Sequence, residues 1–438
     1  MKVLWWTNIL MPDAARQTGR SVSGGSGGWM RNLLERLKLV PDLKLGVISE
    51  GGRKDCEFTV EGVDYFVVKT PLSRGIRNRL RSSKDVQPIP SQIREFASLV
   101  ERWDPDMIHV HGVESSFGLV KAWGLTKKPL AVSIQGLMAP CAVNAYGGLH
   151  PRQVHGKLVA GLGINTRCLH RWKGFQRRSA TEAEIIRAAD IVMGRTEWDH
   201  AWAEHYNPSV RYRHVDELMR TEFLEAAPWR VESCVRRQIF CTSAGEPAKG
   251  LHVLLQAVAG LRKSMPDIAL RIASGGFTPP LDDYARYVIR LIKDLDLEAA
   301  VSFLGVLDAQ KLVQEIQAAN CFVTPSFIEN GCNAVQEAML VGAPCVATLT
   351  GGLLTTIRPE ETGLGFPVGD SALLGRQIAR ILADDALASR IGAEARKTAR
   401  TRHDPATIER QVLDVYRELT GLGENLRAQA QKGHSIGG

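Results

Sequence analysis

The feature of the sequence that most constrains the fold is a regular alternation of short apolar runs with amphipathic stretches. In the first half of the chain, apolar runs typical of buried strands occupy residues 3–6, 44–49, 65–68, 107–110, 130–134 and 191–194. Between them lie stretches with helical periodicity, at residues 29–39, 90–102 and 180–189. Strands that alternate with helices form parallel βαβ units, because a parallel pair of strands needs a crossover connection. The sequence therefore predicts an α/β fold.

The alternation weakens between residues 207 and 237 and then resumes as a second series of similar size. A chain of 438 residues also exceeds the size at which a single core usually keeps growing. We therefore expect two Rossmann-like domains with a substrate cleft between them. The predicted boundaries are 1–229 for the first domain, 230–405 for the second, 406–420 for a final amphipathic helix and 421–438 for a flexible tail.

Composition narrows the class of protein and its location. With 44% apolar and 23% charged residues, the chain is typical of a soluble globular protein. Its eight cysteines include no CxxC pair, which argues against a zinc site and a disulfide framework and favours a reducing cytoplasm. The first residues, MKVLWWTNIL, are expected to form a strand rather than a signal peptide. No apolar run is long enough to span a bilayer, so any membrane contact is expected to be peripheral.

A glycine-rich loop precedes the first long helical stretch and includes Gly24 and Gly25. Glycines let the backbone approach a ligand closely, and the free N–H groups of a helix start attract anions. The spacing is not GxGxxG, so a flexible loop without a ligand is an equal alternative.

Basic residues form two stretches in the first half of the chain. Their attraction to anionic lipid headgroups or to a pyrophosphate-linked acceptor is one hypothesis, and ordinary solvated loops are the alternative. Neither stretch has interleaved aromatics, so no nucleic-acid partner is expected. The stretches consist of Lys69, Arg74, Arg77, Arg79, Arg81 and Lys84, and of Arg152, Lys157, Arg167, Arg171, Lys173, Arg177 and Arg178.

Two histidines, His109 and His111, lie two residues apart at the end of a predicted strand, so both face the same side. Strand ends of this kind carry ligands in doubly wound folds, which favours a role in lining the cleft. A structural histidine pair is an alternative, and a metal site lacks further recognisable ligands.

The second half contains a lysine loop and two carboxylates in positions suited to a phosphorylated sugar. Lys249 lies in a loop before a helix, where it can meet a diphosphate as a point charge. Glu329 and Glu337 lie eight residues apart across the start of a later helix, and carboxylates accept hydrogen bonds from sugar hydroxyls. Asn333 is expected to cap that helix, with Gln336 as its capping-box partner. Two surface glutamates without a ligand are the alternative interpretation.

The stretch PSFIENGCNAVQEAMLVGAPCVAT, followed by GGLLTTI and EETGLGFPVGD, resembles the donor site of the retaining, nucleotide-sugar-dependent glycosyltransferases of family 4, including their Glu-x7-Glu signature. The resemblance extends upstream through AKGLHVLLQAV and, less specifically, through DMIHVHG and the N-terminal glycine loop. It implies the GT-B fold, in which two Rossmann-like domains face each other and a C-terminal helix returns to the first domain. It also implies no essential metal and no cofactor besides the nucleotide sugar.

The resemblance implies roles for individual residues. Glu329 contacts the transferred sugar, Glu337 the ribose and Lys249 the diphosphate. The resemblance also implies donor contacts from the backbone around Gly331, Cys332, Asn333 and Ala334. It places Gly24 and Gly25 on the phosphate side and Gly305 and Val306 beside the base. Two positions depart from the family: Ala244 stands where an arginine is common, with Arg195 as a possible source of the missing charge, and Gln135 stands where a histidine is common.

Taken together, the residues and the resemblance predict a cytoplasmic hexosyltransferase. It is expected to move a hexose from a UDP- or GDP-hexose, with retention, onto a cell-envelope glycan such as lipopolysaccharide or onto a lipid-linked acceptor. A nucleotide-sugar epimerase or phosphorylase of the same architecture is one alternative. A non-catalytic module that binds nucleotides is another.

Overall fold

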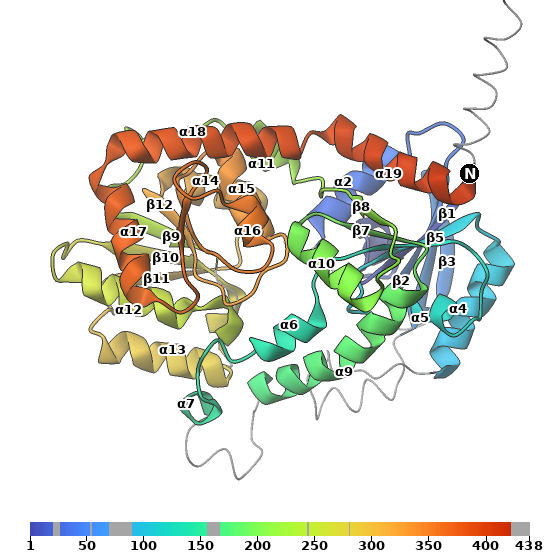
Figure 1. Ribbon diagram of the computed structural model, residues 1–438, viewed down its shortest axis with the longest axis horizontal. Coiled ribbons are helices and arrows are strands. Elements are labelled where there is room, and N and C mark those ends of the chain that lie inside the picture. Colours follow the sequence, from blue (N-terminus) through green and yellow to red (C-terminus); the bar gives the residue numbers. More distant parts are fainter. Residues whose placement is uncertain are drawn as a thin grey trace, which may run out of the picture.

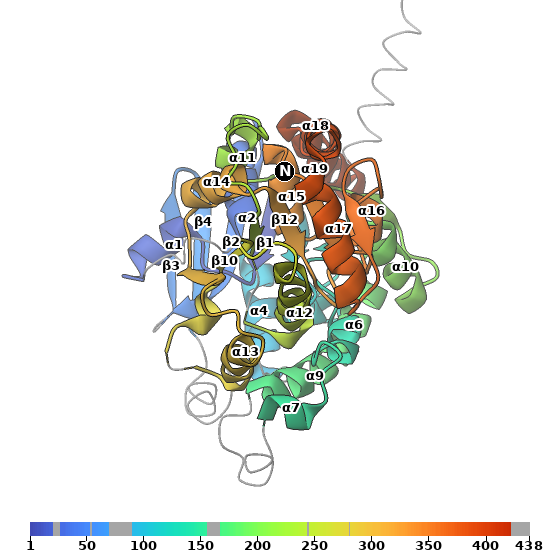
Figure 2. The ribbon, with the colours of Figure 1, turned by 90° about the vertical axis from the view of Figure 1, so that its left-hand side faces the viewer.

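The computed structural model describes residues 1–20, 27–52, 55–69, 90–155, 167–242, 245–279 and 281–421. These residues form two α/β domains that lie side by side (Figure 1). Figure 2, viewed from the side of the second domain, shows helices of that domain in front of its sheet.

The first domain is built on an eight-stranded sheet with the order β3-β4-β2-β1-β5-β6-β7-β8. All neighbouring strands are parallel except β3 and β4. The strands are β1 (Lys2–Thr7), β2 (Lys44–Gly52), β3 (Cys56–Val60), β4 (Val63–Lys69), β5 (Met107–His111), β6 (Leu130–Ser133), β7 (Ile191–Gly194) and β8 (Tyr212–His214). The helices are α1 (Pro12–Gln17), α2 (Gly28–Leu37), α4 (Pro90–Trp103), α5 (Leu119–Ala122), α6 (Met138–Val143), α7 (Pro151–His155), α9 (Arg167–Ala188) and α10 (Glu197–Tyr206).

The second domain is built on a parallel six-stranded sheet with the order β11-β10-β9-β12-β13-β14. The strands are β9 (Gln238–Cys241), β10 (Ala269–Ala273), β11 (Val301–Gly305), β12 (Cys321–Thr324), β13 (Cys345–Thr348) and β14 (Leu364–Phe366). The helices are α11 (Thr221–Glu225), η1 (Pro247–Lys249), α12 (Leu251–Arg262), η2 (Gly275–Phe277), α13 (Asp283–Asp294), α14 (Ala309–Ala318), α15 (Asn333–Val341), α16 (Leu353–Thr356), α17 (Ser371–Ala383) and α18 (Asp385–Arg402).

Helices cover both faces of the first sheet, which explains why its central strands are apolar at successive positions. In β1, Leu4 and Trp6 belong to one apolar core, which includes residues of α4. Val3 and Trp5 point the other way and belong to a second core with residues of α2. Because successive strand residues face opposite sides of a sheet, a strand covered on both faces is apolar throughout.

The last helix, α19 (Pro405–Thr420), returns from the second domain to the first (Figure 1). Its Val412 and Tyr416 are buried in the first-domain core, and the Tyr416 hydroxyl accepts a hydrogen bond of 2.8 Å from the indole N–H of Trp5. Asp404 caps the helix by accepting from the backbone N–H of Thr407. The predicted α/β fold with a returning C-terminal helix is thereby confirmed.

A segment of the first domain packs against the second domain on the side away from α18 and α19 (Figure 1). Val154 and Cys168 belong to the apolar core of the second domain. Arg171 forms an ion pair of 2.8 Å with Glu246. Arg171 of the second basic stretch therefore lies in a contact between the domains, and the proposed attraction of the stretch to anionic groups stays a prediction.

Helix α9 begins at Arg167, well before the predicted helix over residues 180–189. Its first half carries Cys168, Trp172 and Phe175 at helical spacing, but this part of the chain was interpreted only as a basic stretch, so the helix start was missed. Three predicted features lie outside the described residues. They are the part of the first basic stretch that follows Lys69, the glycines Gly24 and Gly25, and the predicted flexible tail from residue 422 onward.

Glu182 of α9 is a fully buried carboxyl that holds the start of α6. It accepts hydrogen bonds from the backbone N–H of Met138 at 2.5 Å and from the Tyr206 hydroxyl at 3.0 Å. Burial raises the pKa of Glu182 from 4.5 to about 7.

We predict that Glu182→Gln makes folding stability less dependent on pH between about 4.5 and 7. In this window the folded protein retains a proton that the unfolded chain has released, so the wild type loses stability as pH rises, by up to about 3 kcal/mol for one such group. Urea denaturation at several pH values measures the effect, with the exposed Glu184→Gln as control. A difference between Glu182→Gln and wild type that does not change with pH contradicts the prediction.

Candidate active site

The start of α15 and the carboxyl ends of β9 and β12 surround a cavity of about 110 Å³ in the second domain. Carboxyl ends of parallel strands are where doubly wound sheets bind ligands. The cavity is lined by Cys241, Thr242, Lys249, Thr324, Pro325, Ser326, Glu329, Cys332, Asn333 and Ala334. It therefore brings together Lys249, Glu329 and three of the four residues predicted around the helix start.

Lys249 and Glu329 form an ion pair inside this cavity. The Lys249 Nζ lies 2.6 Å from Glu329 Oε1, and the Ser326 hydroxyl donates to the same oxygen at 2.7 Å. Burial lowers the pKa of Lys249, but the charge and hydrogen bond of Glu329, together with Cys332 and Glu246, raise that pKa above its ordinary value. The cavity thus holds a fixed cation beside a fixed carboxylate.

The loop that carries Lys249 is held against the end of β12 by a close backbone contact. Gly250 follows Lys249 with a φ of 69°, and a Cβ there would lie 1.9 Å from the carbonyl oxygen of Pro325. Only glycine fits this position without displacing the backbone. The contact places Lys249 opposite Glu329.

The predicted cap of α15 is wrong. Cys332 occupies the N-cap position with a φ of 37°, in the left-handed region, and no side chain caps the helix. The Asn333 amide instead donates to Glu217 Oε2 at 2.8 Å, and Gln336 bonds to Thr356. The N–H groups of Val335 and Gln336 bond to the Cys332 carbonyl, and because no side chain caps the first turn, those of Asn333 and Ala334 are available to an anion beside Lys249.

Glu337 lies outside the lining of this cavity, on the side of α15 that faces Arg220. Both contacts from Arg220, at 2.8 Å from Nε and 2.7 Å from Nη2, go to Oε1 of Glu337. Burial raises the pKa of Glu337 to about 7, although Arg220 works against it. The two glutamates of the signature are therefore in different surroundings.

The loop after β11 carries Gly305 and Val306, away from the residues that line the cavity. Val306 is 74% exposed, and a Cβ added to Gly275 would lie 2.8 Å from its Cγ2. The loop is thus a surface element next to η2.

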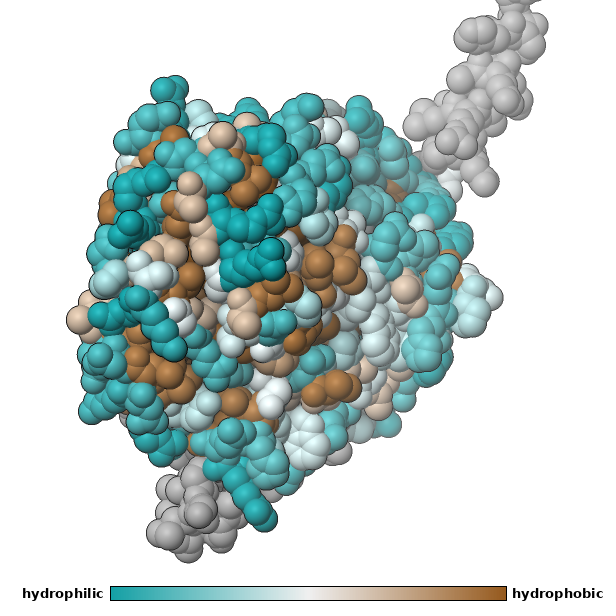
Figure 3. Space-filling view, turned by 60° about the vertical axis from the view of Figure 1, so that its left-hand side comes forward, coloured by the Kyte–Doolittle hydropathy of each residue, from teal (hydrophilic) through white to brown (hydrophobic). Residues whose placement is uncertain are grey.

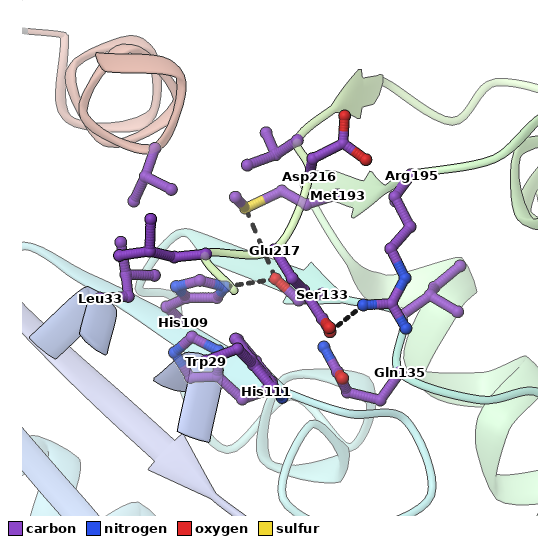
Figure 4. A pocket seen from close by; sticks show the side chains of 15 residues that line it. Trp29, Leu33, His109, His111, Ser133, Gln135, Met193, Arg195, Asp216 and Glu217 are labelled. Carbon is purple, nitrogen blue, oxygen red and sulfur yellow. Dashed lines mark hydrogen bonds and ion pairs between the residues drawn. The ribbon is translucent and has the colours of Figure 1, made fainter. Parts of the chain in front are cut away.

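A second cavity, of about 20 Å³, lies at the carboxyl ends of β5, β6 and β7 in the first domain (Figure 4). It brings together all four residues predicted for the acceptor or cleft side. Its lining residues include Trp29, His109, His111, Ser133, Gln135, Arg195, Asp216 and Glu217.

His109 is part of a chain of hydrogen bonds that reaches α19. Its Nδ1 lies 2.8 Å from the Tyr416 hydroxyl, and its Nε2 lies 2.7 Å from the Ser133 hydroxyl. Since Tyr416 accepts from Trp5, its own proton is free to go to Nδ1, which makes Nε2 the protonated nitrogen of His109. Burial lowers the pKa of His109 to about 3, so the ring is neutral.

Arg195 connects the two cavities. Its guanidinium lies against the donor loop, because a Cβ on Gly331 would come 2.0 Å from Arg195 Nε. It forms a buried ion pair with Glu217, the same carboxylate that accepts from Asn333. Glu217 therefore links the end of β7 to the start of α15.

Sequence reasoning missed Glu217 and Arg220, which lie in the stretch where the alternation weakens. The available signal was local: VDELM places two acids among apolar residues, and in the structure Asp216, Glu217 and their apolar neighbours are all buried. A buried acid needs a partner, which marks the stretch as more than a loop.

A family model matches this chain over the second domain. Residues 235–398 match the family model of the glycosyl transferases group 1. A D-inositol 3-phosphate glycosyltransferase from Corynebacterium efficiens is 33% identical over 176 residues, which are 40% of this chain and 41% of that protein. A phosphatidyl-myo-inositol mannosyltransferase from Mycobacterium leprae is 27% identical over 190 residues, 43% of this chain and 48% of that protein. The matches thus cover less than half of these relatives.

Solved structures resemble the chain over nearly its whole length. Sucrose-phosphate synthase from Thermosynechococcus elongatus superposes with a TM-score of 0.70 and 20% identity, covering 96% of this chain and all of that one. HepE from Anabaena, solved in complex with UDP-glucose, superposes with a TM-score of 0.64 and 17% identity over 95% of this chain and all of that one. At this identity the likeness establishes the fold alone.

The second domain thus matches the glycosyl transferases group 1, and the chain has the two-domain GT-B fold that its sequence resemblance predicted. No helix in the described part of the chain combines the length and apolar character needed to cross a membrane.

Proposed function

We propose that this protein is a glycosyltransferase that uses a nucleotide-diphosphate hexose as donor and retains the anomeric configuration. The observation that carries the proposal is the cavity at the start of α15, where Lys249, Glu329 and an uncapped helix start lie together. A fixed cation and free backbone N–H groups suit a diphosphate, and a carboxylate beside them suits sugar hydroxyls.

In the proposed reaction the bond between the hexose and the diphosphate breaks, the acceptor oxygen bonds to the hexose, and the proton of the acceptor hydroxyl passes to the departing diphosphate. Negative charge develops on the departing diphosphate, and Lys249 with the first amides of α15 stabilises it there. Glu329 orients the hexose by accepting its hydroxyls. Because both contacts from Arg220 use Oε1 of Glu337, we assign Oε2 to the ribose hydroxyls.

The remaining donor-site residues are likewise assigned to the sugar, the phosphates or the base of the donor. Backbone atoms of Gly331, Cys332 and Ala334 contact the sugar and phosphates, and Gly305 with Val306 lies beside the base. The sequence resemblance alone assigns Gly24 and Gly25, which lie outside the described residues, to the phosphates. Structural neighbours solved with UDP or UDP-glucose make uridine donors the first to test.

We also propose that the acceptor is a glycan or a lipid-linked molecule, bound by the first domain. The relatives named above act, by name, on inositol phosphates and on phosphatidylinositol. Peripheral membrane contact rests on the basic stretches. Electrostatic attraction of these stretches to anionic headgroups is the proposed mode of contact. The face shown in Figure 3 carries apolar clusters among hydrophilic residues.

A thermal-shift screen tests the donor assignment. We expect one nucleotide diphosphate and its hexose, among uridine and guanosine compounds, to raise Tm in a concentration-dependent way. Nucleotide release from that donor in the presence of acceptor then identifies a transferase. Conversion of the nucleotide sugar without an acceptor indicates an epimerase instead, and binding without release under any acceptor indicates a non-catalytic module.

A further inference from the structure

A turn of the first domain packs against the short helix η1, which ends at Lys249. Gly147 and Gly148, called here the double-glycine turn, follow α6 and have left-handed φ angles of 56° and 72°. A Cβ added to Gly147 would lie 2.1 Å from the carbonyl oxygen of Pro247, the first residue of η1. The two backbones are therefore in direct contact, and only glycine fits at this point.

The double-glycine turn also contacts the loop that carries Glu329. A Cβ on Gly148 would lie 2.9 Å from Cε1 of Phe327, a residue two positions before Glu329. The backbone N–H of Phe327 donates to the carbonyl oxygen of Ala248 at 2.7 Å, which joins this loop to η1. The turn thus lies where the loops of Lys249 and Glu329 meet.

His252 connects the double-glycine turn to α12, the helix that follows Lys249 in the chain. Its side chain is buried, with Nε2 3.0 Å from the carbonyl oxygen of Gly147 and Nδ1 3.0 Å from the Tyr284 hydroxyl. A carbonyl oxygen only accepts, so Nε2 carries the proton and Nδ1 accepts from Tyr284. Burial lowers the pKa of His252 to about 4, so the ring is neutral and bonded at both nitrogens.

Further contacts anchor the first domain on both sides of this turn. Arg171 pairs at 2.8 Å with Glu246, the residue before η1. Val154 and Cys168 are buried in the core of the second domain. The turn is therefore held in a built contact between the domains, and this contact bears on the residues that precede Lys249.

A lysine binds an anion best when its backbone is fixed beforehand, because binding then orders fewer groups. The lining of the donor cavity includes Lys249, but neither residue of the double-glycine turn and not His252. These groups can therefore affect the donor only by fixing the loops that carry the lining residues.

We propose that the double-glycine turn and His252 are positioning elements of the donor site, which hold Lys249 where the diphosphate binds. On this account the donor site of the second domain is complete only with the turn of the first domain in place. The inference rests on the proposed function, since it concerns the donor of that reaction.

The first test is calorimetric titration of full-length Gly147→Ala with UDP and with GDP. The added methyl group collides with the Pro247 carbonyl, so η1 has to move. We expect the affinity for the nucleoside diphosphate that the wild type binds to fall by about tenfold or more. Gly124→Ala is the matched control, because Gly124 has a φ of 67° but no atom within 4 Å of an added Cβ. Its affinity should equal that of the wild type.

Two variants of His252 test the same contact without a backbone clash. His252→Leu removes the donor to the Gly147 carbonyl and should weaken binding by about tenfold or more. His252→Gln offers an amide N–H to that carbonyl and should recover most of the loss. Both replacements remove the ring that stacks on Phe327, so a difference between them reports on the hydrogen bond rather than on packing.

A double-mutant cycle with Lys249→Gln separates positioning of the lysine from general loosening of the fold. If the turn acts through Lys249, His252→Leu should cost less than about twofold further affinity once the lysine is replaced. Loosening unrelated to the lysine lowers the affinity equally in both backgrounds.

Three results overturn the proposal: wild-type affinity in both Gly147→Ala and His252→Leu, an equal loss in the two His252 variants, or an undiminished effect of His252→Leu in the Lys249→Gln background. In each case the wild type still binds its nucleoside diphosphate, so the proposed function stands. If the wild type binds neither UDP nor GDP, the proposed function itself is wrong and this inference falls with it.

Discussion

Replacing Glu329 by glutamine is expected to lower turnover by at least about a hundredfold while the protein stays folded. The carboxylate lies in the donor cavity, accepts from Ser326 and pairs with Lys249. Glutamine keeps the size and one acceptor oxygen of the glutamate. It lacks the negative charge, which holds Lys249 in place and strengthens hydrogen bonds from sugar hydroxyls. The loss should appear in kcat, measured as nucleotide release, because the orientation of the hexose matters most at the transition state.

The exposed Glu361→Gln serves as the matched control, since it removes a carboxylate at the surface of the same domain. It should leave kcat and Tm unchanged. Turnover of Glu329→Gln near that of the wild type contradicts the assignment of Glu329 to the transferred sugar.

Replacing Lys249 by glutamine is expected to reduce kcat by about a hundredfold to a thousandfold, the usual effect of removing one group that stabilises transition-state charge. Among the described residues that line the donor cavity, Lys249 is the single cation. The variant also leaves Glu329 without its counterion, so binding of a nucleotide diphosphate should weaken through added repulsion. Single-turnover rates and nucleotide titrations separate the two effects.

Lys311→Gln is the control for this variant. Lys311 lies in α14 with a largely exposed side chain, paired with Asp308 within its own helix turn, and its loss should change neither rate nor binding. If Lys249→Gln turns over at the wild-type rate, the diphosphate is held elsewhere and the donor site must be reassigned.

The fold was predictable because most strands of the two sheets carry their own signal, although β3, β8 and β14 were not predicted. Strands β12 and β13 are short apolar runs on either side of α15, and all three were expected from the sequence. Parallel strands buried on both faces are apolar throughout, so this signal does not depend on distant parts of the chain. The cap of α15 was mispredicted since the sequence does not reveal that Glu217 competes for Asn333.

The candidate site was predictable only in part. Lys249 and Glu329 were expected together, and the structure places them 2.6 Å apart. Glu217 and Arg220 were missed because their roles depend on contacts between segments far apart in the chain, with Arg195 and Glu337. No local periodicity encodes such contacts. The roles of all these residues in donor binding stay predictions.

The most direct test of the central claim is calorimetric titration of the wild type, Glu329→Gln and Glu337→Gln with a nucleoside diphosphate and with its hexose. The claim is that Glu329 binds the sugar and Glu337 the nucleotide. It predicts that Glu329→Gln binds the diphosphate at least as tightly as the wild type but loses the extra affinity that the hexose confers. It also predicts that Glu337→Gln weakens both ligands about equally, by roughly tenfold. Unchanged affinity of Glu337→Gln for both ligands, or no difference between Glu329→Gln and wild type toward the hexose, contradicts it.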